Sequence, residues 1–286
     1  MDQQEKGSAH PPTSTDRTSV WLPLLECLTD TVPEWLVLKH PDSAFTGTGD
    51  VDSAAPRARW PEITGAFRRW AAEQQLGTVI VCPHAPTWLH LVALDPTGGR
   101  FYELDVNDRK LFLGSTLYRP KDLAKLTTID PRSFRRLRPG AEGMIKLVHN
   151  GTRRGGRRNA FGLRDKGVLE LLHADPAGVE LAADLFGSAR RAALRGARAA
   201  MEEGWDRPAM LMVELRSILR APLEPDGIAK RGWFRIARQR CPVLHAVFVG
   251  KRFPPPDAQA WLRAVARTHD VFERSSPLVQ VNRPTE

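Results

Sequence analysis

The sequence has few cysteines and no long apolar run. Its three cysteines, Cys27, Cys82 and Cys241, are scattered and show no CxxC spacing, so they suggest neither a zinc site nor a disulfide framework. No apolar run reaches the roughly 20 residues that cross a bilayer. Residues 1–17 lack the apolar centre of a secretory signal. We therefore expect a cytoplasmic protein with no membrane partner.

Common enzyme motifs are missing too. The chain contains no Walker loop and no GxGxxG, HExxH or GxSxG sequence. Each of these motifs supplies a particular phosphate, metal or nucleophile geometry, so their absence removes several common enzyme classes from consideration. An active site in this chain must use another arrangement.

What is present is a globular composition with a basic excess. The chain has 286 residues, 42% hydrophobic and 26% charged, with a formal net charge of +9. Such a charge favours a polyanionic partner, meaning nucleotide phosphates, RNA, DNA or an anionic surface. Most of the excess lies between residues 132 and 158, where nine Lys and Arg residues accompany the single acid Glu142.

The chain length and pattern predict a disordered tail and two domains. Residues 1–17 are polar and have too few apolar groups to order themselves. Residues 18–138 mix helix and strand signals, whereas residues 139–286 are mainly helical. We expect an α+β fold, with a mixed-sheet core at 18–138 and a C-terminal helical domain at 139–286.

Apolar periodicity places the elements of the core. Helices are expected around 21–28 and 61–76, the second opening with Pro61 at a favoured first position. A loop is expected at 41–49, and the turn at 95–99 predicts an antiparallel hairpin from the last two strands. The expected strands are 35–39, 78–81, 88–94 and 101–106. The expected later helices and helical segments are 142–150, 163–173, 179–186, 189–203, 210–219, 230–248 and 257–272.

Two pairs of carboxylates share the same spacing. Asp50 and Asp52 are two residues apart, so on an extended segment they project from one face and repel each other unless a cation lies between them. Mg²⁺, which prefers oxygen ligands, is the natural occupant. Glu103 and Asp105 repeat this geometry on a later strand. If the two strands are neighbours, the carboxylates can hold two metal ions roughly 3.5–4 Å apart.

These features resemble a known enzyme core. A strand, a Gly-rich loop, Asp-hydrophobic-Asp, a helix and a later strand with a further Asp are similar to the DNA polymerase β-like nucleotidyltransferase superfamily, with Thr48-Gly49-Asp50-Val51-Asp52 carrying the match. The resemblance covers roughly residues 19–190. It implies that Asp50, Asp52 and Asp105 are the catalytic and metal-binding residues, with Asp105 activating the acceptor hydroxyl. Glu103 is expected to be their neighbour.

The resemblance also suggests nucleotide contacts. Where the family has a Gly-Ser pair before the aspartates, this chain has residues 37–42, so the phosphates are expected to contact Gly47, Thr48 and Gly49, or Lys39 and His40. Lys146, in a helix similar to the one that closes over the nucleotide, is the expected triphosphate ligand. Glycines between arginines allow close approach to phosphate, so we add Arg153 and Arg154. A solvated surface loop remains the simpler interpretation of that Arg-rich run.

The implied function is transfer of a nucleoside monophosphate from an NTP to a hydroxyl-type acceptor, with Mg²⁺ as cofactor. The acceptor is a small molecule or an RNA end. The alternative is a non-catalytic nucleic-acid-binding or regulatory protein with a degenerate fold of this type. His84 and His90 could orient an acceptor or a base, although isolated histidines more often have structural roles.

Overall fold

The computed structural model describes residues 16–77, 79–85, 87–94, 101–160, 167–224 and 246–247. Most of the expected tail and nearly all of the expected segments 230–248 and 257–272 lie outside this part, as does the start of the segment expected at 163–173. Arg17, placed in the tail above, is 6% exposed, and its guanidinium lies over the Tyr102 ring. Within the described residues no helix is long and apolar enough to span a membrane.

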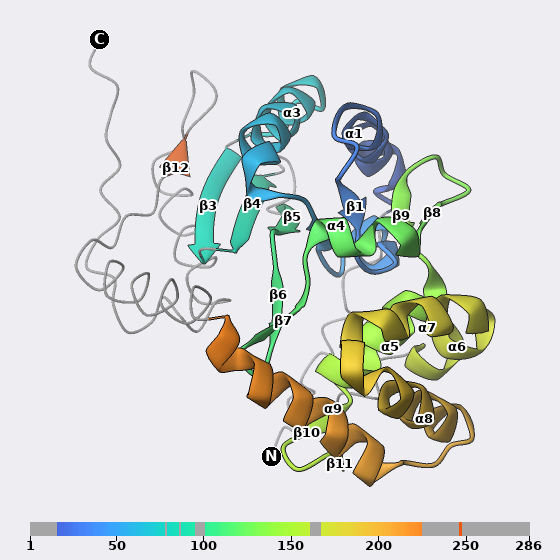
Figure 1. The fold of residues 1–286 in the computed structure, drawn as a ribbon. Coiled ribbons are helices and arrows are strands. Elements are labelled where there is room, and N and C mark those ends of the chain that lie inside the picture. Colours follow the sequence, from blue (N-terminus) through green and yellow to red (C-terminus); the bar gives the residue numbers. More distant parts are fainter. Residues whose placement is uncertain are drawn as a thin grey trace, which may run out of the picture.

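A mixed sheet forms the centre of the fold (Figure 1). Within the described residues it has eight strands. Their order is β12 (Ala246–Val247), β3 (Val79–Ala85), β4 (Trp88–Leu94), β5 (Phe101–Asn107), β2 (Val51–Ala54), β1 (Leu36–Val37), β9 (Arg135–Leu137) and β8 (Thr127–Ile129). The pairs β2–β5 and β1–β9 are parallel and the others antiparallel. The expected antiparallel pairing of β4 with β5 and the α+β class are confirmed. The turn expected at 95–99 lies outside the described residues.

Two helices cover one face of this sheet. They are α1 (Thr18–Thr31) and α3 (Trp60–Glu73), and their buried residues recur at helical spacing. Trp21 of α1 stacks on Trp70 of α3 with ring centroids 5.2 Å apart, and both rings meet the edge of Tyr102 from β5. Because strand side chains alternate, Tyr102, Leu104 and Val106 face these helices while Glu103 and Asp105 point the other way. The expected alternation on this strand is confirmed.

The chain after β5 builds the helical part. A hairpin of β6 (Lys110–Phe112) and β7 (Ser115–Tyr118) leads to α4 (Pro120–Leu123) and the helices beyond it. These are α5 (Pro139–His149), α6 (Val168–Ala174), α7 (Pro176–Ala182), α8 (Arg190–Met201) and α9 (Arg207–Arg220), with 3₁₀ segments η2 (Ala124–Leu126), η3 (Ala183–Ala189) and η4 (Ala221–Leu223). A further 3₁₀ segment, η1 (Arg57–Arg59), comes earlier in the chain, directly before α3. One apolar cluster joins this part to Leu36, Ala54 and Leu137 of the sheet.

Asp175 fastens α7 to the end of β9. Its carboxylate accepts hydrogen bonds from Arg138 Nε at 3.0 Å and Nη2 at 2.6 Å, and from the backbone N–H groups of Gly140 and Gly178. Burial alone would raise the pKa of Asp175, but these hydrogen bonds outweigh it and hold the pKa below 3.8. Gly140 has to be glycine, because a Cβ there would overlap the carbonyl oxygen of Asp175.

Several elements differ from the expectations. The loop expected at 41–49 contains the short helix α2 (Asp42–Phe45), because Ala44 and Phe45 are buried and Phe45 meets Phe134 edge-on. Strand β9, in the Arg-rich stretch, and strand β8 just before it were not expected. Arg135 nevertheless fits there, since its guanidinium donates to the carbonyls of Pro33 and Trp35.

The Arg-rich run near residue 155 forms a hairpin rather than a plain loop. Strands β10 (Thr152–Arg153) and β11 (Arg157–Arg158) are joined through Gly155 and Gly156, whose φ angles are +78° and +65°. The N–H groups of both glycines donate to the carboxylate of Glu214 in α9, at 2.8 and 3.0 Å. Glu214 is 3% exposed, so this contact fixes the hairpin against α9.

Candidate metal centre

The parallel pairing of β2 and β5 brings three aspartates together. Asp52 lies directly beside Asp105 in the register, and Asp50 projects from the same face two residues earlier. One carboxylate oxygen from each of Asp50, Asp52 and Asp105 lies within 4.8 Å of the others. Asp105 is 3% exposed, and the side chains of Asp50 and Asp52 are about a third exposed or less. These three residues, expected from the sequence, could hold a metal ion.

Lys39 already places a positive charge in this cluster. It follows β1, which pairs antiparallel with β2, and its Nζ lies 3.0 Å from Asp50 Oδ1 and 2.5 Å from Asp52 Oδ2. Burial alone would lower the pKa of Lys39, but the charges of Asp52 and Asp50 outweigh this effect and raise it. Burial and the charge of Asp50 raise the pKa of Asp52, despite the opposing effect of Lys39. The charges of Asp50 and Asp52 therefore repel each other, and Lys39 offsets part of this repulsion.

His90, named from the sequence only as a residue that could orient an acceptor or a base, is a direct neighbour of Asp105. Cross-strand pairing of β4 and β5 places it directly opposite Asp105, and its Nδ1 is paired with Asp105 Oδ1. Both side chains are buried. Burial alone would lower the pKa of His90, but the hydrogen bond and charge of Asp105 raise it. His90 therefore orients the Asp105 carboxylate. The side chain of His84 lies outside the described residues.

Glu103 lies near the same cluster. It is on the same face of β5 as Asp105, and its pKa is raised by burial and by the nearby charge of Asp50, against the effect of His90. Its carboxylate adds negative charge beside the three aspartates.

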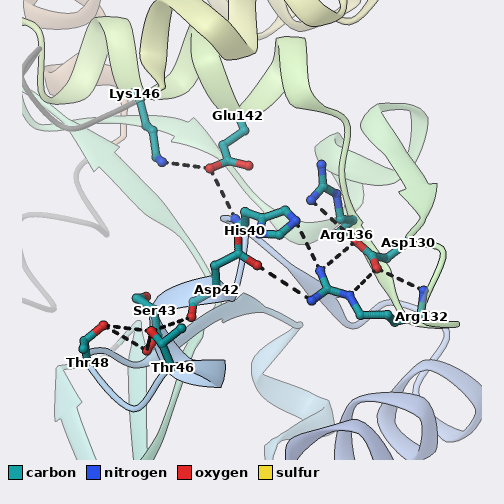
Figure 2. A network of polar contacts seen from close by, with 10 residues as sticks. All are labelled: His40, Asp42, Ser43, Thr46, Thr48, Asp130, Arg132, Arg136, Glu142 and Lys146. Atoms are coloured by element: carbon teal, nitrogen blue, oxygen red, sulfur yellow. Dashed lines mark hydrogen bonds and ion pairs between the residues drawn. The ribbon is translucent and has the colours of Figure 1, made fainter. Parts of the chain in front are cut away.

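The segment after β1 is held by a polar network (Figure 2). The backbone N–H of His40 donates to Glu142 Oε1 of α5, and Lys146 Nζ lies 2.8 Å from the same oxygen. Arg132 lies between His40, Asp42 and Asp130, as Figure 2 shows. Lys146, the expected triphosphate ligand, is therefore paired with Glu142 beside the loop that follows β1.

The loop proposed above for phosphate contacts uses its hydrogen-bonding groups internally. The N–H of Gly47 donates to Ala44 and that of Thr48 donates to Ser43, at 3.1 and 2.8 Å. The Thr48 hydroxyl bonds Thr46 and Ser43. In the described structure, Gly47 and Thr48 therefore direct these groups into their own loop, while Gly49 leads into Asp50.

Arg153 and Arg154 are exposed on the β10–β11 hairpin. Arg153 Nε donates to Asn159 Oδ1 at 3.1 Å, within the same hairpin. Figure 1 shows the hairpin beside α9, at the opposite end of the described structure from β3, β4 and β5. The structure thus brings Lys39 to the aspartates and leaves these two arginines away from them.

No protein-family model, curated protein sequence or solved structure matches this chain.

Proposed function

We propose that the protein is a metal-dependent nucleotidyltransferase, which moves a nucleoside monophosphate from an NTP to a hydroxyl-type acceptor and releases pyrophosphate. One observation carries the proposal: Asp50, Asp52 and Asp105, from two adjacent parallel strands, gather their carboxylate oxygens within 4.8 Å. The arrangement of these three aspartates is the one implied by the resemblance of Thr48–Asp52 to the polymerase β-like core.

The donor set fits Mg²⁺. All three side chains offer carboxylate oxygens, the ligands that this hard cation prefers. The Lys39 ammonium between Asp50 and Asp52 indicates that a cation is favoured in that position. When bound there, Mg²⁺ would supply charge neutralisation for the phosphoryl group being transferred and for the attacking oxygen.

The neighbouring side chains have defined parts in this proposal. A carboxylate oxygen of Asp105 accepts the proton of the acceptor hydroxyl, and His90 Nδ1 holds that carboxylate in place. Lys39 contacts the triphosphate, because its flexible stem allows the ammonium to exchange carboxylate oxygens for phosphate oxygens. The acceptor is a small molecule or an RNA end.

Radiolabelled NTPs test the proposal directly. The full-length protein is incubated with each NTP, Mg²⁺ and pools of small-molecule or RNA acceptors, and transfer is compared with the variant Asp50→Asn/Asp52→Asn. We expect the double variant to lose transfer, with Asp30→Asn on the exposed side of α1 as the matched control. Transfer that is unchanged in the double variant would refute the assignment. Binding of an RNA acceptor should weaken steeply with salt, whereas turnover of a small acceptor should not.

A second candidate is a non-catalytic nucleic-acid-binding or regulatory protein. The ammonium of Lys39 already offsets part of the charge of Asp50 and Asp52, and the N–H groups of Gly47 and Thr48 are used within their loop. Both features suit a site that holds no nucleotide. Calorimetry separates the two candidates: RNA binding without any Mg²⁺ or NTP binding would select the non-catalytic one.

A further inference from the structure

Arg216 is a buried cation with few partners. It lies on α9 and is 8% exposed. Its Nη2 donates to the carbonyl of Leu185 at 3.3 Å, whereas Nε and Nη1 have no hydrogen-bond acceptor in the described part of the chain. A buried guanidinium normally has its N–H groups paired with carboxylates or carbonyls, because leaving them unpaired is costly.

The surroundings of Arg216 oppose its charge. Burial and the nearby charge of Arg220 lower the pKa of Arg216, and Glu224 only partly compensates. Gly187 of η3 has φ +51° and ψ −118°, a conformation that suits glycine, and a Cβ there would lie 3.2 Å from Arg216 Nη2. The backbone thus leaves room for the guanidinium without supplying the missing acceptors.

Arg216 lines a cavity of about 720 Å³ between β7, α4, η3 and α9. Figure 1 shows the β6–β7 hairpin reaching α9 at this place. Lys121 and Lys125 are exposed at the rim, and Arg119 and Arg220 also line it. The apolar part of the cavity wall is formed by Leu117, Leu126 and Leu185. The volume is typical of a small-molecule site.

The acidic residues that line the cavity already have hydrogen-bond or ion-pair partners. Glu224 accepts the backbone N–H of Thr116 and lies 3.4 Å from Arg220. Asp184 pairs with Arg190 at 2.7 Å. Asp122 accepts the backbone N–H of Arg119. The positive charge of Arg216 and of the two rim lysines therefore has no carboxylate of its own in the described structure.

We propose that this cavity binds the phosphate group of a small organic phosphate, with Arg216 at its base and Lys121 and Lys125 at its rim. A phosphate offers acceptors that match the planar fork of a guanidinium. The leucine wall suits the carbon skeleton that carries the phosphate. None of the three clustered aspartates lines the cavity, so the site is separate from the candidate metal centre.

Calorimetry on the full-length protein in EDTA tests this site without involving any metal-dependent one. The probes are inorganic phosphate and phenyl phosphate, the second adding an apolar body. We expect saturable binding to the wild type, tighter for phenyl phosphate, with the dissociation constant raised about tenfold or more by Arg216→Met. The matched control is Arg191→Gln, an exposed arginine on α8, which should bind like the wild type.

Replacing a buried unpaired charge with an apolar side chain of similar length is expected to leave the fold intact. A second variant, Lys121→Gln/Lys125→Gln, changes only exposed residues and should also weaken binding. The proposal is overturned if the wild type shows no saturable binding of either probe, or if Arg216→Met binds as tightly as the wild type. Should Arg216→Met not fold, wild-type affinity in the lysine double variant overturns it.

Discussion

Removing the Lys39 ammonium should expose the repulsion between the carboxylates it joins. The ligand atoms of Asp50 and Asp52 are at most 4.8 Å apart, and two unit charges at that distance repel by about 3.5 kcal/mol at an effective dielectric constant of about 20. Water reaches side chains that are 26–30% exposed and relieves part of this repulsion. We therefore expect Lys39→Met to lower the free energy of unfolding by about 1–3 kcal/mol in EDTA.

A divalent cation should reverse this loss, because it would occupy the same carboxylate oxygens as the ammonium. Thermal unfolding is measured in EDTA and in a Mg²⁺ series. In EDTA the melting temperature of Lys39→Met should fall by roughly 2–10 °C, and Mg²⁺ should raise it more in the variant than in the wild type. Lys39→Arg keeps the charge and is the control. An equal Mg²⁺ response in the wild type and Lys39→Met, or no loss in EDTA, would refute the reasoning.

Three further substitutions are predicted to change stability, and urea denaturation measures each of them. Asp175→Asn removes the charge that binds Arg138 and should cost about 1–3 kcal/mol at neutral pH. The pKa of Asp175 is lowered on folding, so its contribution to stability is complete above pH 3.8 and is lost as the pH falls through the lower, folded-state pKa. The free energies of unfolding of the wild type and the variant should therefore converge in acid. A difference that stays constant with pH would contradict this prediction. Gly140→Ala should cost about 1–3 kcal/mol or more, because its Cβ would overlap the carbonyl of Asp175. Gly65→Ala, in an open position of α3, should instead stabilise the protein by about 0.5–1 kcal/mol. Equal changes in the free energy of unfolding for the two alanine variants would contradict this expectation.

The elements that sequence predicted well are those whose burial follows a simple period. Helix α3 shows its apolar face at helical spacing after Pro61, and apolar and acidic residues alternate along β5 from Tyr102 to Val106, although Asp105 is buried as well. Strand β9 was not predicted because one of its two buried positions is occupied by arginine. Arg136 is 9% exposed and lies 3.6 Å from Asp130, so a local apolarity pattern gives no sign of it.

The candidate site likewise contains residues that the sequence could place and one that it could not. The meeting of Asp50, Asp52 and Asp105 followed from alternation together with one assumption, that their strands are neighbours. The pairing of His90 with Asp105 was within reach as well, because the hairpin that pairs Leu94 with Phe101 leads back along both strands to these two residues. The contact of Lys39 with both Asp50 and Asp52 could not be predicted from the sequence, because it depends on a side-chain conformation across two strands.

The basic stretch shows why charge counted along a sequence overstates charge in space. Between residues 132 and 158 the chain has one acid, yet Arg132 and Arg136 pair with Asp130, and Arg138 pairs with Asp175, both from outside the stretch. The exposed arginines that remain are on the β10–β11 hairpin, beside α9 and away from the sheet (Figure 1). An RNA acceptor held by this hairpin would have to reach the aspartates from the other end of the described structure. These pairings therefore leave the basic stretch as weak support for an RNA acceptor, and the salt dependence of acceptor binding is the measurement that separates the two acceptor classes.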